Sequence, residues 1–219
     1  MTNDMIEDIR DAFIDSQVED LSTELNSDRF IRLEQEHKQQ TEKREKQKKI
    51  KQLQMYFTGP EKIKKLLDLS GIINDDERTL QVLEPTAGYG AIVKALINLE
   101  DTNNEMLDMS IDMVEFDIEN RVELEKLISL APDILSISLE NNFLRYQPSK
   151  RYDYIIMNPP FHLKNSTNTI YTRDVYDTDF IMRAYTMLKP DGVLVAIIST
   201  RWNTIDDDIS KDFKGFIDF

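Results

Sequence analysis

The chain has 219 residues, 40% of them hydrophobic, a formal net charge of −14 and no cysteine. This length allows one globular domain with an accessory segment. Without cysteine there is no disulfide, no thiolate metal site and no methylation of cytosine at C5, which needs a cysteine nucleophile. The negative charge argues against a protein that coats nucleic acid over a broad surface. With two histidines and no clustered metal-ligand spacing, no metal site is predicted.

Two features of the sequence bear on location. There is no run of about 18 consecutive apolar residues, the length that a transmembrane helix needs. The N-terminus is acidic and lacks the basic and then apolar pattern of a signal peptide. We therefore expect a soluble, intracellular protein without membrane contact, in the cytoplasm or together with host DNA.

Residues 1–54 are predicted to form a charged helical extension. Met5, Ile9 and Phe13 recur at helical spacing near its start. Residues 34–49 include no apolar side chain, so no face of this segment can be buried. Glutamate precedes lysine by four residues here, an order that stabilises an exposed helix by roughly 0.2–0.5 kcal/mol per pair. The pairs are Glu34/Lys38, Glu42/Lys46 and Glu45/Lys49.

A dense positive cluster occupies the second half of that segment. Basic stripes of this kind contact nucleic acid by neutralising phosphates, which would make DNA or RNA a partner. A solubilising linker helix fits the same composition equally well. The acidic residues before the cluster could instead fold back on it, and the N-terminal helices could bind a protein partner or a second copy. The cluster consists of Lys43, Arg44, Lys46, Lys48, Lys49 and Lys51.

In residues 55–219, predicted strands alternate with predicted helices. Short apolar runs rich in β-branched residues indicate strands, and apolar residues three to four apart indicate helices. This alternation predicts an α/β protein with a doubly wound sheet whose ligand-binding loops lie at one edge. The expected strands are 80–84, 112–117, 135–139, 152–157 and 193–199, the last one after a turn at 189–192. The expected helices start near 61 and 91 or span 122–130, 179–188 and 204–216.

The first strand of this sheet leads into Glu84-Pro85-Thr86-Ala87-Gly88-Tyr89-Gly90 and then a helix. Gly88 and Gly90 permit positive φ and close approach of a ligand to the backbone. Val93 stands where a dinucleotide-binding loop has its third glycine, which disfavours a dinucleotide. Glu84 would repel a pyrophosphate but would pair with a cation such as the amino group of a methionine. The next expected strand, 112–117, ends in acids that include Glu115, a placement that suits binding of ribose hydroxyls.

Asn158-Pro159-Pro160-Phe161 follows the strand 152–157. Two successive prolines fix φ and remove two backbone donors, so the turn is rigid. The Asn158 side-chain oxygen and the Pro159 carbonyl could each accept one N–H of a planar exocyclic amine, so that its nitrogen pyramidalises and attacks an electrophile. Phe161 would offer a flat surface for the ring. A stiff loop without chemical function is the alternative for this motif alone.

Four motifs in this order resemble those of the S-adenosylmethionine-dependent amino-methyltransferases, most closely the N6-adenine DNA methyltransferases whose cofactor motifs precede the catalytic one. They are Phe57-Thr58-Gly59-Pro60, the loop 84–90, Glu115-Phe116-Asp117 and Asn158-Pro159-Pro160-Phe161. The resemblance covers residues from about 56 to 219. It implies a Rossmann-like class I methyltransferase sheet, S-adenosylmethionine as cofactor, and methyl transfer to the N6 amine of adenine in DNA.

The resemblance also implies roles for residues at the methionine end of the cofactor. Thr58 resembles a contact to the methionine carboxylate. Glu84 and Pro85, together with the backbone of Gly88 and Gly90, resemble the cradle that holds this end of the molecule.

At the other end of the cofactor, Glu115 resembles the ribose ligand and Phe143 resembles the residue packed on the adenine. Asn142 stands where the family often has an aspartate that accepts from the adenine amine. Its oxygen could still accept that hydrogen bond, but without the charge, so we expect ordinary rather than tight cofactor affinity. The catalytic motif is carried over to Asn158, Pro159, Pro160 and Phe161.

Two departures from the family pattern leave alternatives open. The family fold normally closes with an antiparallel pair of strands after the helix predicted at 204–216, whereas this sequence stops at Phe219. A truncation, a partner that completes the sheet, or cover by the N-terminal helices would each account for this. No separate target-recognition domain is apparent, so sequence specificity would come from the loop 162–177, the basic helix or another subunit.

The methyl acceptor is open as well. An RNA base amine or a protein glutamine amide fits the same Asn-Pro-Pro-aromatic chemistry, and the acidic charge makes these more plausible than they would otherwise be. A catalytically silent methyltransferase-like subunit that binds a partner is the remaining alternative. The intact Asn158 and Glu115 argue against it.

Overall fold

The computed structural model describes residues 27–53, 58–74, 79–100, 105–165 and 171–217. The chain divides into two units, Met1–Lys51 and Gln52–Phe219, each of which is described by itself. The helical periodicity predicted at residues 5–25 and the aromatic residues at 56–57 lie outside the described residues.

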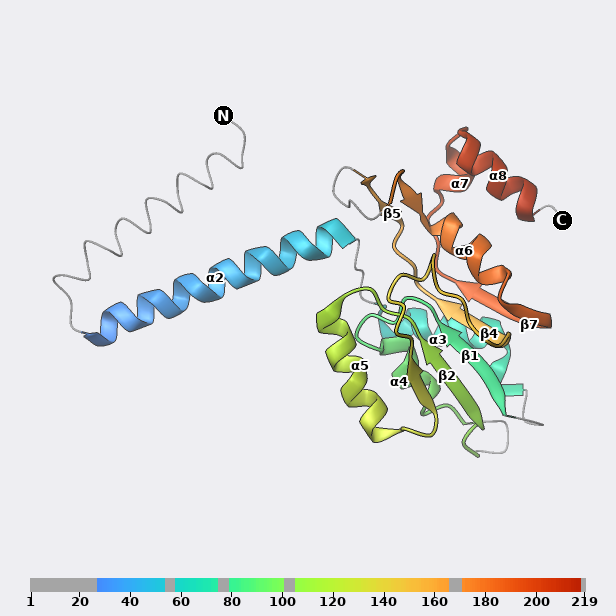
Figure 1. The fold of residues 1–219 in the computed structure, drawn as a ribbon, viewed down its shortest axis with the longest axis horizontal. Helices are drawn as coiled ribbons and strands as arrows, with labels where there is room; N and C mark the ends of the chain where they lie inside the picture. The colour runs from blue at the N-terminus through green and yellow to red at the C-terminus, as the bar shows by residue number, and fades with distance from the viewer. Residues whose placement is uncertain (1–26, 54–57, 75–78, 101–104, 166–170, 218–219) are drawn as a thin grey trace. The chain divides into compact units, whose positions relative to one another are not determined.

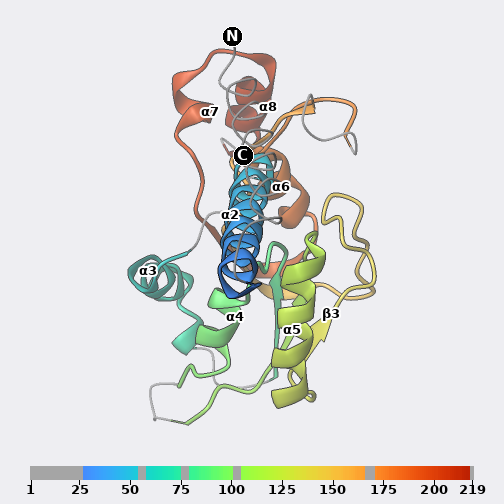
Figure 2. The same cartoon turned by 90° about the vertical axis from the view of Figure 1, so that its left-hand side faces the viewer.

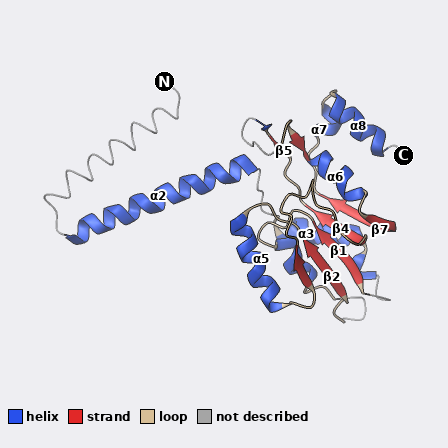
Figure 3. Cartoon of the chain, in the orientation of Figure 1, coloured by secondary structure: helices blue, strands red, loops and turns tan. Residues whose placement is uncertain are grey.

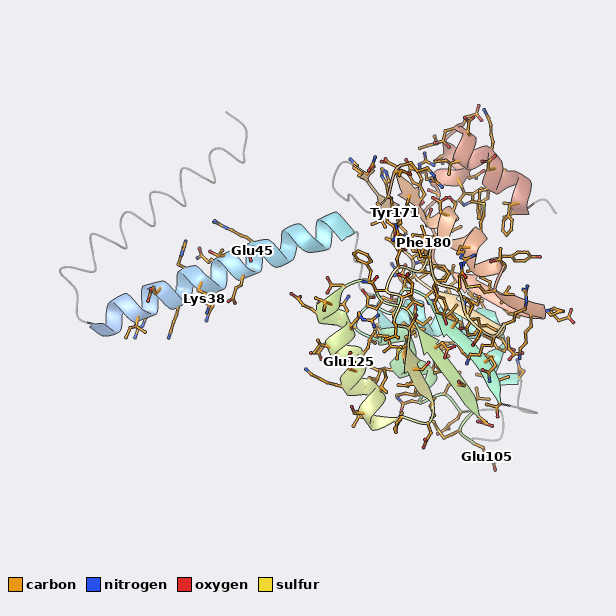
Figure 4. All side chains as sticks on the ribbon, viewed as in Figure 1. Lys38, Glu45, Glu105, Glu125, Tyr171 and Phe180 are labelled. Atoms are coloured by element: carbon orange, nitrogen blue, oxygen red, sulfur yellow. The ribbon has the colours of Figure 1, made fainter. Side chains whose placement is uncertain are left out.

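The first unit contains one long helix, α2 (Ser27–Leu53). The described side chains between residues 31 and 45 are exposed or half-exposed, as expected for a segment without an apolar face. Figure 4 shows Lys38 and Glu45 projecting away from the helix axis. All six residues of the basic cluster lie on this helix.

The second unit is organised around a parallel sheet of five strands in the order β3-β2-β1-β4-β7 (Figures 1 and 3). Strand order reverses beside β1, since the chain moves from β1 to β2 and β3 on one side and then crosses to β4 on the other. Such a reversal places the ligand-binding loops at the carboxyl ends of the central strands. The strands are β1 (Leu80–Glu84), β2 (Met109–Met113), β3 (Leu135–Ile137), β4 (Tyr152–Met157) and β7 (Leu188–Ala196).

Helices cover both faces of this sheet. Ile63, Leu66 and Leu124 belong to a core that also contains Val82 and Ile156 of the strands. On the other face, helix side chains such as Phe180 and Phe213 pack with alternate strand residues, Leu83 and Ile155 among them. Figure 2 shows α3, α4 and α5 next to one another. The helices are α3 (Pro60–Ser70), the short 3-10 helix η1 (Ile72–Asn74), α4 (Ala91–Leu96), α5 (Ile118–Leu130), α6 (Asp177–Tyr185), α7 (Arg201–Thr204) and α8 (Asp208–Ile217).

Several predicted boundaries were wrong. The second strand covers 109–113 rather than 112–117, because Glu115 and Asp117 turn inward and Asp117 caps α5. The segment 189–192 is a bulge inside β7, not a turn before it. Gly192 is required there because a Cβ would stand 2.9 Å from the Tyr152 carbonyl oxygen. The predicted helix 204–216 starts only at Asp208, because α7 ends at Thr204 and the backbone at Ile205 is extended.

A small antiparallel hairpin was not predicted. It joins β5 (His162–Leu163) to β6 (Val175–Tyr176), directly after the double-proline turn. Each strand has only two residues, too few for a periodic signal in the sequence.

The sheet ends at β7 within the described residues, where no strand pairs with its outer edge or follows α8. None of the helices that the structure describes combines the length and the apolar composition needed to cross a membrane.

Candidate active site

The candidate site lies at the carboxyl edge of the sheet. Glu84 is the last residue of β1, Glu115 follows β2 by two residues, and Asn158 directly follows β4. Backbone hydrogen bonds from Val114 N to Glu84 O and from Ala87 N to Val114 O hold the first two of these loops together. Parallel strands thus bring three of the predicted site segments to one edge.

Asn158 presents an acceptor. Its Nδ2 donates to Thr58 Oγ1 at 2.9 Å, while its Oδ1 is buried and has no hydrogen-bond partner among the described residues. Buried polar atoms are normally paired, so an orphaned oxygen in a rigid loop marks a place for a donor from outside the chain. The sequence prediction that this oxygen is free for an N–H is compatible with the geometry.

The turn that carries Asn158 is anchored on its far side. The Phe161 carbonyl accepts from Asp177 N at 3.3 Å, and the buried Asp177 carboxylate accepts from Ser199 N at 2.5 Å. This links the turn to the start of α6 and to the segment after β7. The Phe161 side chain is half-buried, and Pro159 is buried next to the half-buried Pro160. Asp177 and Ser199 were missed by the sequence analysis, since nothing in their spacing points to the turn.

Glu84 is a buried carboxylate with a hydrogen-bond partner at only one of its two oxygens among the described residues. It is 1% exposed, Thr86 Oγ1 lies 3.5 Å from its Oε1, and its Oε2 has no partner among the described residues. Burial raises the pKa of Glu84 to about 8, and the nearby Glu115 adds to this rise. A cationic group beside the free oxygen would compensate the buried charge.

Gly88 and Gly90 both adopt positive φ, at 53° and 76°. A Cβ on Gly90 would come within 3.0 Å of a Leu124 methyl group, so glycine is needed there for the packing of α4 against α5. A Cβ on Gly88 would meet nothing within 4 Å. The backbone at Gly88 therefore faces open space, where a ligand can approach.

Glu115 is 8% exposed and organises the neighbouring loop. Its Oε2 accepts from Gly88 N at 2.6 Å, and its Oε1 accepts from Asp117 N at 2.6 Å and from Asn120 Nδ2 at 3.3 Å. Burial raises the pKa of Glu115, and these hydrogen bonds oppose the rise. One lone pair on Oε2 is left for an additional donor, such as a hydroxyl group. Asn120, a partner that the sequence analysis missed, lies in the first turn of α5.

Asn142 lies in the loop after β3. Its amide nitrogen is unpaired among the described residues, whereas in Asn158 the amide oxygen is unpaired. Asn142 Oδ1 accepts from Leu144 N at 3.0 Å and from the Tyr171 hydroxyl at 3.0 Å, and its buried Nδ2 has no partner in the described part of the chain. The oxygen was predicted to accept from a ligand, but two donors from the protein already occupy it. Figure 4 labels Tyr171, which comes from the long loop between β5 and β6 and gives no signal in the sequence.

Phe143 lies in the core rather than on an open surface. It is 3% exposed, and its ring stacks on Phe180 with 6.0 Å between the centroids. Little of the ring is left for contact with a ligand. Phe180 is labelled in Figure 4.

A model of the methyltransferase small domain family matches residues 69–216, about two thirds of the chain. The chain belongs to this family. The family is one of methyltransferases, and membership implies S-adenosylmethionine as the cofactor. The match spans the sheet and its loops, from the end of α3 to α8.

Solved structures share the fold of this methyltransferase small domain protein. A proposed class I S-adenosylmethionine-dependent methyltransferase from Listeria monocytogenes aligns with a TM-score of 0.58 at 14% identity, over 77% of this chain and 55% of that one. A type I restriction-modification methyltransferase subunit from Streptococcus thermophilus aligns with a TM-score of 0.57 at 13% identity, over 73% and 38%. A proposed RNA methyltransferase from Pyrococcus horikoshii gives 0.51 at 21%, over 75% and 70%. The chain thus spans about half the length, or less, of the first two.

The residues at this edge fit S-adenosylmethionine on structural grounds. The orphaned oxygen of Glu84 suits the ammonium group of the methionine end, and the open space at Gly88 suits close approach to the backbone. The remaining lone pair of Glu115 suits a ribose hydroxyl. Pro85, which directly follows β1, is buried.

The loop 162–177, a predicted source of specificity, is held by ring and charge contacts. His162 lies over the Tyr176 ring with 4.5 Å between centroids, and its Nε2 is 2.7 Å from Asp174 Oδ2. The Arg201 guanidinium lies 3.8 Å from the centroid of the same tyrosine. Because one face of Tyr176 is covered by His162, Arg201 must cover the other. The hairpin beside the double-proline turn is therefore tied to α7.

Proposed function

We propose that this chain transfers a methyl group from S-adenosylmethionine to the exocyclic N6 amine of adenine in DNA. The observation that carries the proposal is the buried, unpaired Oδ1 of Asn158 at the carboxyl end of β4, directly before a double-proline turn. A single acceptor in a rigid loop suits an N–H of a planar amine.

Several residues are assigned to the cofactor in this proposal. Glu84 holds the ammonium group, the backbone of Gly88 faces the methionine end, and Glu115 binds the ribose. When bound, S-adenosylmethionine supplies an electrophilic methyl group: the amine nitrogen bonds to the methyl carbon, the carbon–sulfur electron pair goes to sulfur, and the amine proton is lost to water.

The chain itself prepares the amine. The adenine amine is a poor nucleophile because its lone pair is conjugated with the ring. Hydrogen bonds from its two N–H groups to Asn158 Oδ1 and the Pro159 carbonyl would favour a pyramidal nitrogen. Phe161 would stack on the base after it leaves the duplex, a step that costs a few kcal/mol. Most of the rate enhancement would then come from orientation of the amine toward the methyl group.

Contact with the nucleic acid backbone is assigned to the basic cluster of α2. Residues 43–51 include six cations and one acid, Glu45, whereas the whole chain carries a net charge of −14. Binding through this helix would weaken steeply with salt, because each phosphate contact releases counterions. A protein partner or a second copy on the N-terminal helices is the other assignment for this unit.

The proposal is tested by incubating the protein with labelled S-adenosylmethionine and duplex DNA, single-stranded DNA, RNA or total protein, and by mass spectrometry of the digested products. N6-methyladenine in DNA is the expected product. Methylation of an RNA base amine or of glutamine would refute the DNA assignment and keep the amine chemistry.

A silent subunit is distinguished by its response to the cofactor. Cofactor at about 100 times its dissociation constant stabilises a protein that binds it by roughly 2.7 kcal/mol. We expect a corresponding rise in the melting temperature of this protein on addition of S-adenosylmethionine. A protein without that rise, and without transfer to any substrate, would be a silent subunit.

A further inference from the structure

We infer that Thr58 is a positioning residue, which determines which end of the Asn158 amide faces the amine to be methylated. This inference rests on the proposed function, because it assigns Asn158 Oδ1 to a substrate N–H. The observation that carries it is the hydrogen bond from Asn158 Nδ2 to Thr58 Oγ1, 2.9 Å long, between residues 100 positions apart.

A primary amide has a donor end and an acceptor end of nearly equal size. Rotation by about 180° around its last bond exchanges them, so a site that needs the oxygen must occupy the nitrogen with something else. An N–H of the substrate would be repelled by the NH₂ end. Thr58 accepts from that end, and Oδ1 has no partner among the described residues.

Thr58 is well placed to hold this contact. It directly precedes Gly59, whose carbonyl accepts from Lys62 N at 3.0 Å and Ile63 N at 3.1 Å at the start of α3. Pro60 stiffens the first turn of the helix. The apolar face of α3, with Leu66 and Leu67, is buried against the sheet that carries Asn158. The hydroxyl is therefore fixed relative to the amide by packing.

A contact to the cofactor alone would give Thr58 a different role. A hydroxyl that accepts from Asn158 still has its own proton to donate, so it can also bind a ligand. Substitution of Thr58 distinguishes a contact to the cofactor from orientation of the Asn158 amide. Loss of a ligand contact weakens cofactor binding, whereas loss of amide orientation lowers the rate once both substrates are saturating.

Two variants and a control make the test. Thr58→Val keeps the shape and removes the acceptor, and Thr58→Ser restores the hydroxyl. Thr186→Val is the matched control, since this exposed threonine lies beyond the end of α6. Melting temperatures of all three identify any variant that fails to fold.

The first readout needs no turnover. In protein labelled with ¹⁵N-asparagine, the Asn158 side-chain NH₂ signals are assigned by their loss in Asn158→Ala. We expect Thr58→Val to shift these signals, and Thr58→Ser and Thr186→Val to leave them near their original positions. Unchanged signals in Thr58→Val would overturn the inference.

The second readout is methyl transfer to the adenine substrate. At saturating cofactor and DNA, we expect Thr58→Val to lower kcat about 3- to 10-fold, the scale of one neutral hydrogen bond, and Thr58→Ser to recover most of it. An unchanged kcat with weaker cofactor binding would make Thr58 a cofactor contact only and overturn the inference. If the unaltered protein methylates no adenine, the proposed function is refuted. The NMR measurement still tests whether Thr58 is hydrogen-bonded to the Asn158 amide.

Discussion

In the described part of the chain, the loops after β3 and β4 each place an asparagine with one buried, unpaired amide atom at the same edge of the sheet, with opposite results. Asn142 has its oxygen occupied by two donors and offers Nδ2, whereas Asn158 has Nδ2 occupied and offers Oδ1. The residue type is identical. What differs is which end of the amide the rest of the chain has already paired.

The two amides also differ in how firmly they are held. Asn142 Oδ1 faces the backbone N–H of Leu144, which can only donate, so this amide cannot turn around without a clash of two donors. Asn158 faces a hydroxyl, which can donate or accept. A backbone N–H therefore fixes the direction of the Asn142 amide, whereas Thr58 can fix that of Asn158 only when its own hydroxyl proton is donated to a ligand, as in the proposed site.

The largest effect is expected from removal of the substrate-side acceptor. Asn158→Ala should lower methyl transfer about 100- to 1,000-fold, the usual cost of losing one group that stabilises a transition state. The cofactor dissociation constant, measured by titration calorimetry, should change little. Asn98→Ala, an exposed asparagine after α4, is the control. An equal loss of transfer and cofactor binding would mean that Asn158 is structural.

The next effect concerns Glu84, on the cofactor side. Glu84→Gln removes a charge that the cofactor ammonium should contact, so affinity should fall about 10- to 100-fold, the scale of a hydrogen bond to a charged group. Calorimetry at about pH 7 measures this, because the α-amino group of the cofactor, with an ordinary pKa of about 7.7–8.0, is still protonated there. An unchanged affinity would exclude Glu84 as the partner of the ammonium group.

The same substitution has a signature in the protein without cofactor. Because the pKa of Glu84 is raised from 4.5 to about 8 on folding, the folded state holds a proton that the unfolded state releases between these values. The free energy of unfolding should therefore fall as the pH rises from 4.5 to about 8. Urea unfolding should show a flatter pH dependence for Glu84→Gln. A slope equal to that of the unaltered protein would contradict the raised pKa.

A smaller effect is expected when the unpaired donor of Asn142, in the proposed cofactor site, is replaced by an acceptor. Asn142→Asp replaces the unpaired Nδ2 by an oxygen that can accept from an amine of the ligand, so S-adenosylmethionine should bind about 3- to 10-fold more tightly. Transfer at saturating cofactor should stay near its original rate. Weaker binding would mean that Nδ2 donates to a ring nitrogen of the ligand instead.

The smallest effect is expected from Tyr171→Phe. This change removes one of the two donors to Asn142 Oδ1 and leaves the Leu144 N–H in place, so the amide should keep its direction. Cofactor affinity should change by about twofold or less. Tyr185→Phe, at an exposed position on α6, is the matched control. A change above tenfold would show that the loop, rather than the backbone, sets the polarity of Asn142.

Local patterns in the sequence were sufficient for much of the fold. The sequence predicted β1 and β4 with their observed ends, because a short run of mostly buried residues leaves a signal without tertiary help. The same applies to α2, whose charges exclude any buried face. The glycines and prolines of the two site loops indicated rigid or left-handed backbone, which is a property of those residues themselves.

Only the tertiary structure decided how the polar groups pair. Whether an amide offers its oxygen or its nitrogen depends on the partners that the fold supplies, which are Thr58 for Asn158 and the Leu144 N–H together with Tyr171 for Asn142. The extent of β2 and the bulge in β7 depended on neighbouring strands in the same way. Residue type and spacing are local properties that a sequence displays. Hydrogen-bond saturation is a property of the assembled neighbourhood, and it decides whether a polar side chain faces a ligand as donor or as acceptor.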